Sequence, residues 1–406
     1  MATDLRHTIE HLTTWERPSA SEGERRAAEW IAAELRELGY TADVEEERAH
    51  GTYWWPIGLA TAFAGAAGVA RPKGLRGRVV AAAVAAVSAL AVWDECGLWR
   101  GYWTRRFLPK RSTWNVVGRG GDADASRTLV LVAHHDAAHT GLAFDFTAVR
   151  AYAERFPERV ENGRAWPGTM NLVFYGPVLV ALGSLLRLKR VRALGTILSL
   201  GSAANMANIG ASQVVPGAND NLSAVAAVLE VAKRLRDEPL PGGLRVLFVS
   251  TGSEESFEEG MTAFIDRHEH ELPRESTDIL VLDTVGSPRL ILMEGEGMLT
   301  KRPYSGPLKD TVAAAAEEAG VELIREHWLS FGSDTLITLR KGYRGALLAS
   351  FDEHKLPSNY HQPTDTADRI DYSTVEDAVR VAEATARRIA RGDAEFGPDA
   401  AAPAAA

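Results

Sequence analysis

The chain of 406 residues is long enough to bury a large core, either as one domain enlarged by insertions or as two domains. Its formal net charge of −9 argues against a surface that binds nucleic acid through phosphate contacts. The single cysteine, Cys96, excludes an intramolecular disulfide and a zinc site built on thiolates. A metal site in this chain would therefore use histidine and carboxylate ligands.

The N-terminal part predicts a helix followed by two strands. The opening residues, MATDLRHTIEHL, lack the basic and then apolar run of a secretory signal, so we expect the N-terminus to stay where it is made. Ser21 and Glu24 fit a capping box, and apolar residues at helical spacing predict a helix over residues 24–38. TADVEEE (41–47) and NVVGRG (115–120) predict strands.

Uncharged apolar stretches interrupt this pattern at residues 54–70, 79–93, 170–186 and 193–215. The basic segments RPKGLRGR and RLKRVR join them in pairs, which predicts two hydrophobic helical hairpins with basic tips. A bilayer span needs ~17–25 apolar residues, so each stretch is marginal in length or, being rich in Ala, Gly and Ser, in hydrophobicity. We expect the hairpins to associate with a membrane; the alternative is a helical cap or a homo-oligomer surface of a soluble protein.

The remaining chain alternates apolar runs with amphipathic segments. Strands are predicted at residues 128–133, 244–250, 278–283, 321–326 and 345–350. Helices are predicted at residues 222–235, 307–319 and 373–390. This alternation predicts an α/β fold in which a mainly parallel, mixed sheet lies between helices as a three-layer α/β/α arrangement.

Histidine and acidic side chains directly follow three of these strands, as His134-His135-Asp136, Glu254-Glu255 and Asp283. Open α/β sheets bind ligands beyond the carboxyl ends of their strands, so these side chains are candidate metal ligands. Asp220 in PGANDN fits a ligand or a simple helix cap, and His361, in a turn-rich loop, fits a ligand or a solvated side chain. Taken together, the nitrogen and oxygen donors favour zinc, with manganese or cobalt as alternatives.

These motifs carry a family resemblance. HHD after a strand, PGANDN before a helix, EE in STGSEES, the aspartate of LDTVG and the histidine of NYHQPTDT resemble, in order and context, the co-catalytic di-zinc aminopeptidases. This group of clan MH metallopeptidases also includes glutamate carboxypeptidases. The resemblance implies a single zinc-peptidase-like catalytic domain over residues 1–392, interrupted by hairpins at about 52–100 and 168–213 and followed by a disordered tail over 393–406.

The resemblance also implies a role for each matching residue. His134 and Asp283 would bind one zinc ion, Glu255 and His361 would bind the second, and Asp220 would bridge the two ions. Glu254 would act as the general base that takes a proton from the attacking water. Asp136 would accept the second N–H of the His134 imidazole and fix its tautomer.

Other residues near these motifs are weaker candidates. His135 is expected to point away from the site, His268 to be solvated, and His354 to line the pocket at most. Asp334 in FGSDT resembles a family aspartate that supports the site from outside the ligand set. Some relatives follow that aspartate with histidine, where this chain has Thr335, so the residue that assists the oxyanion stays open.

Strand direction predicts where the hairpins leave the sheet. If residues 41–47, 115–120 and 128–133 form an antiparallel meander, both hairpins emerge at the end where the candidate ligands lie. The absence of a signal and of disulfides favours a membrane-associated protein with a cytoplasmic catalytic domain, and a soluble cytoplasmic protein is the alternative.

The function predicted is that of a zinc exopeptidase that removes N-terminal residues from peptide or aminoacyl substrates. Carboxypeptidase, N-acyl amino acid hydrolase or glutaminyl cyclase activity at the same site is the second possibility. A non-enzymatic membrane receptor or scaffold on a degenerate peptidase fold is the third, and the complete ligand and base set argues against it.

Overall fold

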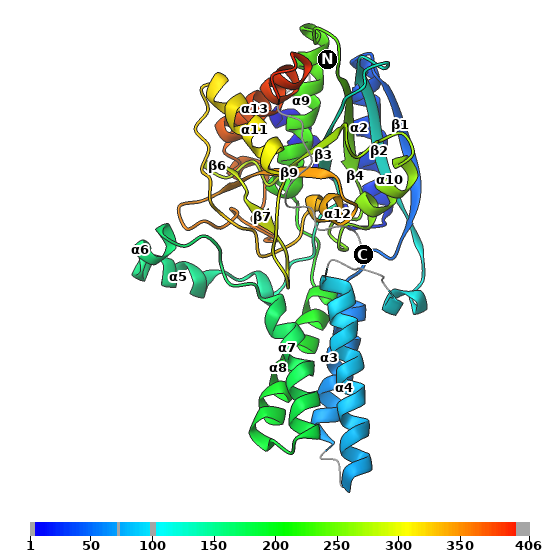
Figure 1. Cartoon of the computed structure of the whole chain (residues 1–406), viewed down its shortest axis with the longest axis vertical. Helices are drawn as coiled ribbons and strands as arrows, with labels where there is room; N and C mark the ends of the chain where they lie inside the picture. The colour runs from blue at the N-terminus through cyan, green and yellow to red at the C-terminus, as the bar shows by residue number, and fades with distance from the viewer. Residues whose placement is uncertain (1–4, 71–73, 98–102, 395–406) are drawn as a thin grey trace.

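The computed structural model describes residues 5–70, 74–97 and 103–394. A seven-stranded mixed sheet in the order β1-β2-β4-β3-β5-β9-β6 forms its centre (Figure 1). The strands are β1 (Thr41–Ala49), β2 (Arg111–Gly121), β3 (Thr128–His134), β4 (Arg245–Thr251), β5 (Thr277–Asp283), β6 (Arg289–Leu292) and β9 (Arg344–Phe351). β4, β3, β5 and β9 are parallel, whereas β1, β2 and β6 run antiparallel to their neighbours. The predicted α/β class is confirmed.

Helices cover both faces of the sheet. The side chains of Leu129 and Leu131 in β3 point to one face and those of Val130 and Val132 to the other, and all four are buried. One face packs against α1 (Leu5–Leu12), α2 (Glu22–Glu37), α9 (Ser223–Asp237), α11 (Gly306–Glu318) and α13 (Tyr372–Ala390). The other face packs against α10 (Glu259–His268) and α12 (Asp334–Arg340). The four parallel strands therefore lie between two helical layers.

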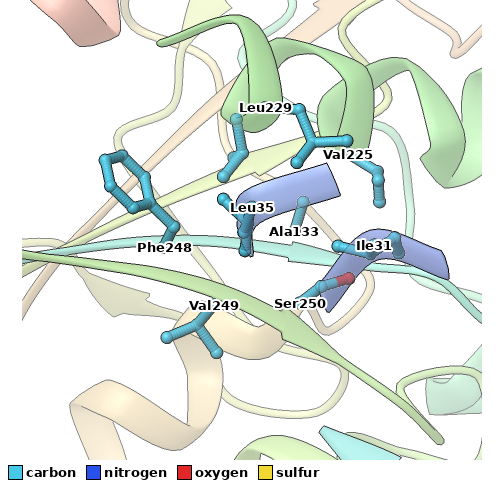
Figure 2. A pocket seen from close by; sticks show the side chains of 9 residues that line it. Ile31, Leu35, Ala133, Val225, Leu229, Phe248, Val249 and Ser250 are labelled. Atoms are coloured by element: carbon cyan, nitrogen blue, oxygen red, sulfur yellow. The ribbon is translucent and has the colours of Figure 1, made fainter. Parts of the chain in front are cut away.

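The core between α2, α9 and the sheet is closely packed. Figure 2 shows Ile31 and Leu35 of α2, Val225 and Leu229 of α9 and Phe248 of β4 around a small gap. The gap has a volume of about 10 Å³, which is no more than one water molecule would fill. This layer holds the strands, and with them the residues at their ends, in fixed positions.

Two expectations about strands are wrong. β2 pairs with β4 and not with β3, so the first three strands are not a meander; β4, from much later in the chain, lies between them. Residues 321–326 form only an isolated bridge of Ile324 to Ile291. β2 is still antiparallel to β4, and β4 is parallel to β3, so the connection after β1 does lie at the carboxyl end of β3.

Four apolar helices project from the sheet domain as a separate bundle (Figure 1). They are α3 (Trp54–Val69), α4 (Gly74–Cys96), α7 (Met170–Leu185) and α8 (Lys189–Ala211). α3 packs against α4 and α8, and α7 packs against α4 and α8, so the two hairpins form one four-helix bundle. Within the described residues, α4 is the single helix long and apolar enough to cross a membrane by itself, and half of its most apolar window is buried.

Short elements connect these layers. They comprise η1 (Trp103–Phe107), η2 (Leu142–Phe144), α5 (Thr147–Arg155), α6 (Pro157–Glu161), η3 (Ala218–Leu222), β7 (Gly295–Glu296), β8 (Arg302–Pro303) and η4 (Ala367–Arg369). The predicted disordered tail lies outside the described residues from position 395 onward.

Candidate active site

Three neighbouring parallel strands deliver candidate ligands to one edge of the sheet. His134 is the last residue of β3, Asp283 is the last residue of β5, and Glu254 and Glu255 follow β4. These strands are adjacent and parallel, so their carboxyl ends meet. Asp220 joins them from the irregular turn η3 before α9.

Asp220 lies between the two histidines. Its Oδ1 is 3.2 Å from His134 Nε2, and its Oδ2 is 3.1 Å from His361 Nε2. Glu255 Oε2 is 3.2 Å from His361 Nε2, and Glu254 Oε2 is 3.7 Å from His134 Nε2. One carboxylate therefore presents a separate oxygen atom to each histidine.

The residues of this cluster form three overlapping groups of possible metal ligands. Their donor atoms lie within 4.8 Å of one another in the sets His134–Asp220–Asp283, Asp220–Glu255–His361 and His134–Glu254–Glu255. The structure thus brings together every residue predicted from the sequence to bind metal. The first two of these sets have Asp220 in common, as a ligand that bridges two ions would require.

The electrostatics of the cluster fit a bound cation. Four buried or half-buried carboxyl groups face two histidines, and burial raises the pKa of Asp283 to about 8 and that of Glu254 well above its usual range. Burial opposes the charge on His361, but Glu255 and Asp220 outweigh it and raise its pKa to about 10. Glu255 Oε1 is buried without a hydrogen-bond partner. A divalent cation would supply the positive charge and the missing partner.

Asp136 supports more of the site than the sequence predicted. His134 Nδ1 lies 3.3 Å from the backbone carbonyl oxygen of Asp136 and 3.5 Å from its Oδ1. The same carboxylate accepts hydrogen bonds from the backbone N–H groups of Glu254 at 3.0 Å and Glu255 at 3.1 Å, and from Ser19 Oγ at 2.6 Å. Asp136 therefore positions the two glutamates as well as the histidine.

Two further buried acids hold the same segments and were missed by the sequence analysis. Asp365 accepts from the backbone N–H groups of Asn219 at 2.8 Å and Asp220 at 3.1 Å, and burial raises its pKa to about 7. Glu24 Oε1 accepts from the backbone N–H of Ser253 at 2.6 Å. Asp365 lies four residues after His361 within the motif, whereas only the fold brings the capping-box residue Glu24 to the site.

Aromatic rings line one side of the cluster. Tyr360 stacks on His361 with ring centroids 3.9 Å apart, and Phe144 contacts His361 edge-on at 4.3 Å. Phe331 stacks on the other side of Tyr360 at 5.7 Å. Burial, followed by the charges of Asp220 and its neighbours, raises the pKa of Tyr360 well above its usual range, so its hydroxyl stays protonated.

The weaker sequence candidates occupy different places. His135 is buried and its Nδ1 lies 2.9 Å from Ser250 Oγ, away from the cluster. His354 has Glu353 beside its Nε2 at 3.7 Å. The expectation that His268 is solvated is wrong, because it is buried between Glu45 and another carboxylate of the domain surface.

Asp334 lies beside the cluster without joining a ligand set. Thr251 Oγ1, at the end of β4, donates to Asp334 Oδ2 at 2.5 Å. The charge of Asp334 contributes to the raised pKa values of Glu254 and Asp283 after burial and closer charges. This placement agrees with the supporting position expected from the sequence.

A buried arginine connects the bundle to the loop of residues 252–258, which carries Glu254 and Glu255 and is called the glutamate loop below. Arg105 Nε donates to Glu95 Oε2 at the end of α4 at 2.9 Å, and Nη1 donates to the carbonyl oxygen of Ser256 at 2.9 Å. Nη1 also lies 3.0 Å from Glu259 Oε2. Burial opposes the ionisation of Glu259, but Arg105 and His50 outweigh it and lower its pKa to about 2.

Aromatic and polar contacts make two further connections. Phe257, two residues after Glu255, stacks on Tyr53 at the start of α3 with ring centroids 4.4 Å apart. His139, five residues after His134, donates through Nδ1 to the carbonyl oxygen of Ser212 after α8 at 2.7 Å. Both hairpins are thus fixed to loops that carry candidate ligands.

Comparison with known proteins gives a family match over part of the chain. Residues 203–386 match peptidase family M28, a span that includes Asp220, Glu254, Glu255, Asp283 and His361. M28 members are mostly zinc hydrolases, which supports zinc as the metal of this cluster. No curated protein gives a significant sequence match.

Solved structures share the fold of this chain. The aminopeptidase from Aneurinibacillus sp. strain AM-1 is 15% identical, with a TM-score of 0.56 over 99% of this chain and 97% of that chain. BSAP, a zinc aminopeptidase from Bacillus subtilis, is 14% identical, with a TM-score of 0.54 over 98% and 97%. A glutaminyl cyclase from Bacteroides thetaiotaomicron is 13% identical, with a TM-score of 0.51 over 94% and 96%. The fold therefore accommodates more than one activity.

Proposed function

We propose that this chain is a zinc-dependent exopeptidase of the aminopeptidase type, acting on peptide or aminoacyl substrates. The position of Asp220, with one oxygen facing His134 and the other facing His361, carries the proposal. We assign His134 and Asp283 to one zinc ion, Glu255 and His361 to a second, and Asp220 to both. Manganese or cobalt would suit the same nitrogen and oxygen donors.

Glu254 is proposed as the general base. Zinc bound beside it would polarise the scissile carbonyl and lower the pKa of a water molecule. Glu254 Oε2 lies 3.7 Å from His134 Nε2, beside the proposed metal ligands, so its carboxylate is placed to accept a proton from water and return it to the departing amine. The protonated hydroxyl of Tyr360 is proposed to donate a hydrogen bond to the oxyanion.

The first experiment is Glu254→Gln. Loss of a general base lowers kcat by roughly 10²–10⁴-fold, so we expect a loss of this size while metal analysis still finds close to two ions per chain. Glu353→Gln changes an exposed carboxylate on the loop after β9 and should keep full activity. Full activity of Glu254→Gln would overturn its role as base.

Metal stoichiometry separates two roles for Glu254. Its carboxylate also belongs to a compact set with His134 and Glu255. If Glu254 were a ligand, Glu254→Gln would lose metal together with activity. Retention of both ions with loss of turnover supports the base, and a fall towards one ion supports the ligand.

A substrate panel decides between activities on the same fold. After chelation and restoration of zinc, aminoacyl, N-blocked and C-terminal reporter substrates are compared. Preference for a free α-amine supports the aminopeptidase. Faster turnover of C-terminal or N-acyl substrates would indicate a carboxypeptidase or N-acyl amino acid hydrolase, and cyclisation of N-terminal glutamine would indicate the activity named for the Bacteroides neighbour. No turnover with a full metal content would favour a receptor or scaffold.

We further propose that residues 1–392 form a single catalytic domain. The helical pairs α3–α4 and α7–α8 interrupt the order of sheet elements, after β1 and after β3 respectively. Since the four helices pack mainly against one another, they are proposed as insertions that leave the sheet intact. Limited removal of both hairpins with short linkers, followed by a test for retained metal binding, examines this division.

A further inference from the structure

The four-helix bundle of α3, α4, α7 and α8 has mainly small side chains inside, and many of its large apolar side chains lie outside. Buried positions include Ala64, Gly65, Ala85, Gly176, Gly195 and Ser199. The outer positions Phe63, Leu75, Val80, Leu90, Leu172 and Ile197 are 57–68% exposed. A helical bundle folded in water buries its largest apolar side chains, so this arrangement is the reverse of the expected one.

The helices also approach each other closely through their glycines. A Cβ atom on Gly195 of α8 would lie 2.6 Å from the backbone nitrogen of Val180 in α7, and one on Gly65 of α3 would lie 2.4 Å from Leu200 Cδ2 in α8. Small residues that allow such contact are typical of helix interfaces within lipid, where packing rather than apolar burial holds helices together.

The exposed apolar side chains are concentrated in this bundle. Among the residues that the structure describes, the large hydrophobic side chains classed as exposed belong to the four helices or the turn 186–188, apart from Phe107, Leu142, Tyr152 and Phe156. The strands of the sheet and the helices packed on it contribute none within the described segments. A contiguous apolar surface of this kind on one part of a protein indicates a partner that covers it.

Charge and length indicate what that partner is. α3 and α7 contain no charged residue, and residues 79–93 of α4 and 193–211 of α8 are also uncharged. Basic residues lie at the far end of the bundle, where Arg78 Nη1 donates to the carbonyl oxygen of Leu185 at 3.5 Å and links the two tips. At ~1.5 Å per residue, the uncharged residues 79–93 of α4 extend ~22 Å and residues 193–211 of α8 extend ~28 Å, which approaches a hydrocarbon layer of ~30 Å.

We infer that the bundle is embedded in a lipid bilayer, with its outer face against acyl chains and its basic tips at lipid phosphates. A second protein copy would not require an uncharged surface around all four helices, nor the basic residues at one end. Phe257 stacks on Tyr53 where α3 begins, so the glutamate loop lies directly above the embedded part. The proposed catalytic site is thereby held at the membrane surface.

The test uses the full-length protein and does not depend on its activity. We expect it in the membrane fraction after an alkaline carbonate wash, released by detergent, and floating with phosphatidylcholine–phosphatidylglycerol vesicles after reconstitution. The triple variant Val80→Glu, Val84→Glu and Val87→Glu places charges on outer positions of α4 and should reduce the membrane-bound fraction at least tenfold. Tyr152→Glu with Phe156→Glu changes exposed apolar residues of α5 and its end, and should leave partition unchanged.

Cysteine labelling distinguishes lipid from protein as the cover. Phe63→Cys and Val80→Cys should react with a water-soluble maleimide at least tenfold more slowly in vesicles than in detergent, whereas Tyr152→Cys reacts equally in both; the native Cys96 is buried. Equal labelling of all three in vesicles would overturn the inference. So would recovery of the wild-type protein in the detergent-free soluble fraction, including as an oligomer that covers these positions. Because these readouts need no turnover, they stand apart from failure of the proposed peptidase function.

Discussion

The sheet domain and the four-helix bundle distribute their apolar side chains in opposite ways. In β3 and β5, Leu129, Val130 and Leu280 are fully buried, and in the bundle Phe63 and Leu90 are each 62% exposed. The same residue types thus lie inside one region and outside the other. The difference shows that composition alone does not reveal a core; the medium surrounding each region decides which side chains are buried.

The two regions are joined by a buried charged network rather than by apolar packing alone. Arg105 links Glu95 at the end of α4 to Ser256 and Glu259 beside the glutamate loop. Charged groups in such a position are stable only when they are paired. Substitutions in this junction of Arg105, Glu95 and Glu259 therefore test how the two regions are held together.

The largest effect on stability is expected from Arg105→Met. It leaves Glu95 and Glu259 buried without their cation, at a cost of ~3–5 kcal/mol in the free energy of unfolding. Denaturant unfolding in detergent measures this loss. Arg119→Met removes a partly exposed partner of Asp43 and should cost at most ~1 kcal/mol. Similar losses in the two variants would show that the junction contributes no more than a surface pair.

Matched leucines test the two apolar distributions directly. Leu280→Ala in β5 creates a cavity in the sheet core and should cost ~2–5 kcal/mol. Leu90→Ala on the outer face of α4 should change the free energy of unfolding in detergent by less than ~0.5 kcal/mol. An equal cost at Leu90 would mean that protein, not lipid or detergent, packs against that face.

The smallest expected effect is the acid sensitivity of the junction. The pKa of Glu259 is about 2 in the folded chain, below the ordinary value of 4.5. Between these values the unfolded chain binds the proton and the folded one does not, so stability falls as pH falls; the loss reaches ~2 kcal/mol by pH 3. Unfolding of wild type and Glu259→Gln at pH 7 and pH 3 gives the difference. Glu259→Gln should lack this loss of stability between pH 7 and pH 3. An identical pH dependence in wild type and variant would contradict the role of Glu259.

Much of the sheet domain could be predicted from the sequence because its signals are local. Continuous apolar runs marked β3, β4, β5 and β9, which are buried on both faces. The order of polar residues after these strands identified the cluster around Asp220. The candidate metal ligands that the sequence motifs contain lie together in the structure.

What the sequence did not reveal depends on distant contacts. The insertion of β4 between β2 and β3 is a choice among strand partners that no local pattern encodes. Glu24 is an ordinary capping-box residue until the fold buries it against Ser253. His268 was expected to be solvated because the sequence around it is charged, but it is buried between the local Glu271 and the distant Glu45 of β1.

Asp136 has a consequence for how the site assembles. Its carboxylate touches His134 on one side and fixes the backbone of Glu254 and Glu255 on the other, while Asp220 divides its oxygens between two histidines. Neither half of the cluster can relax without disturbing the other. In the proposed two-ion site, the first ion to enter would therefore order ligands for the second.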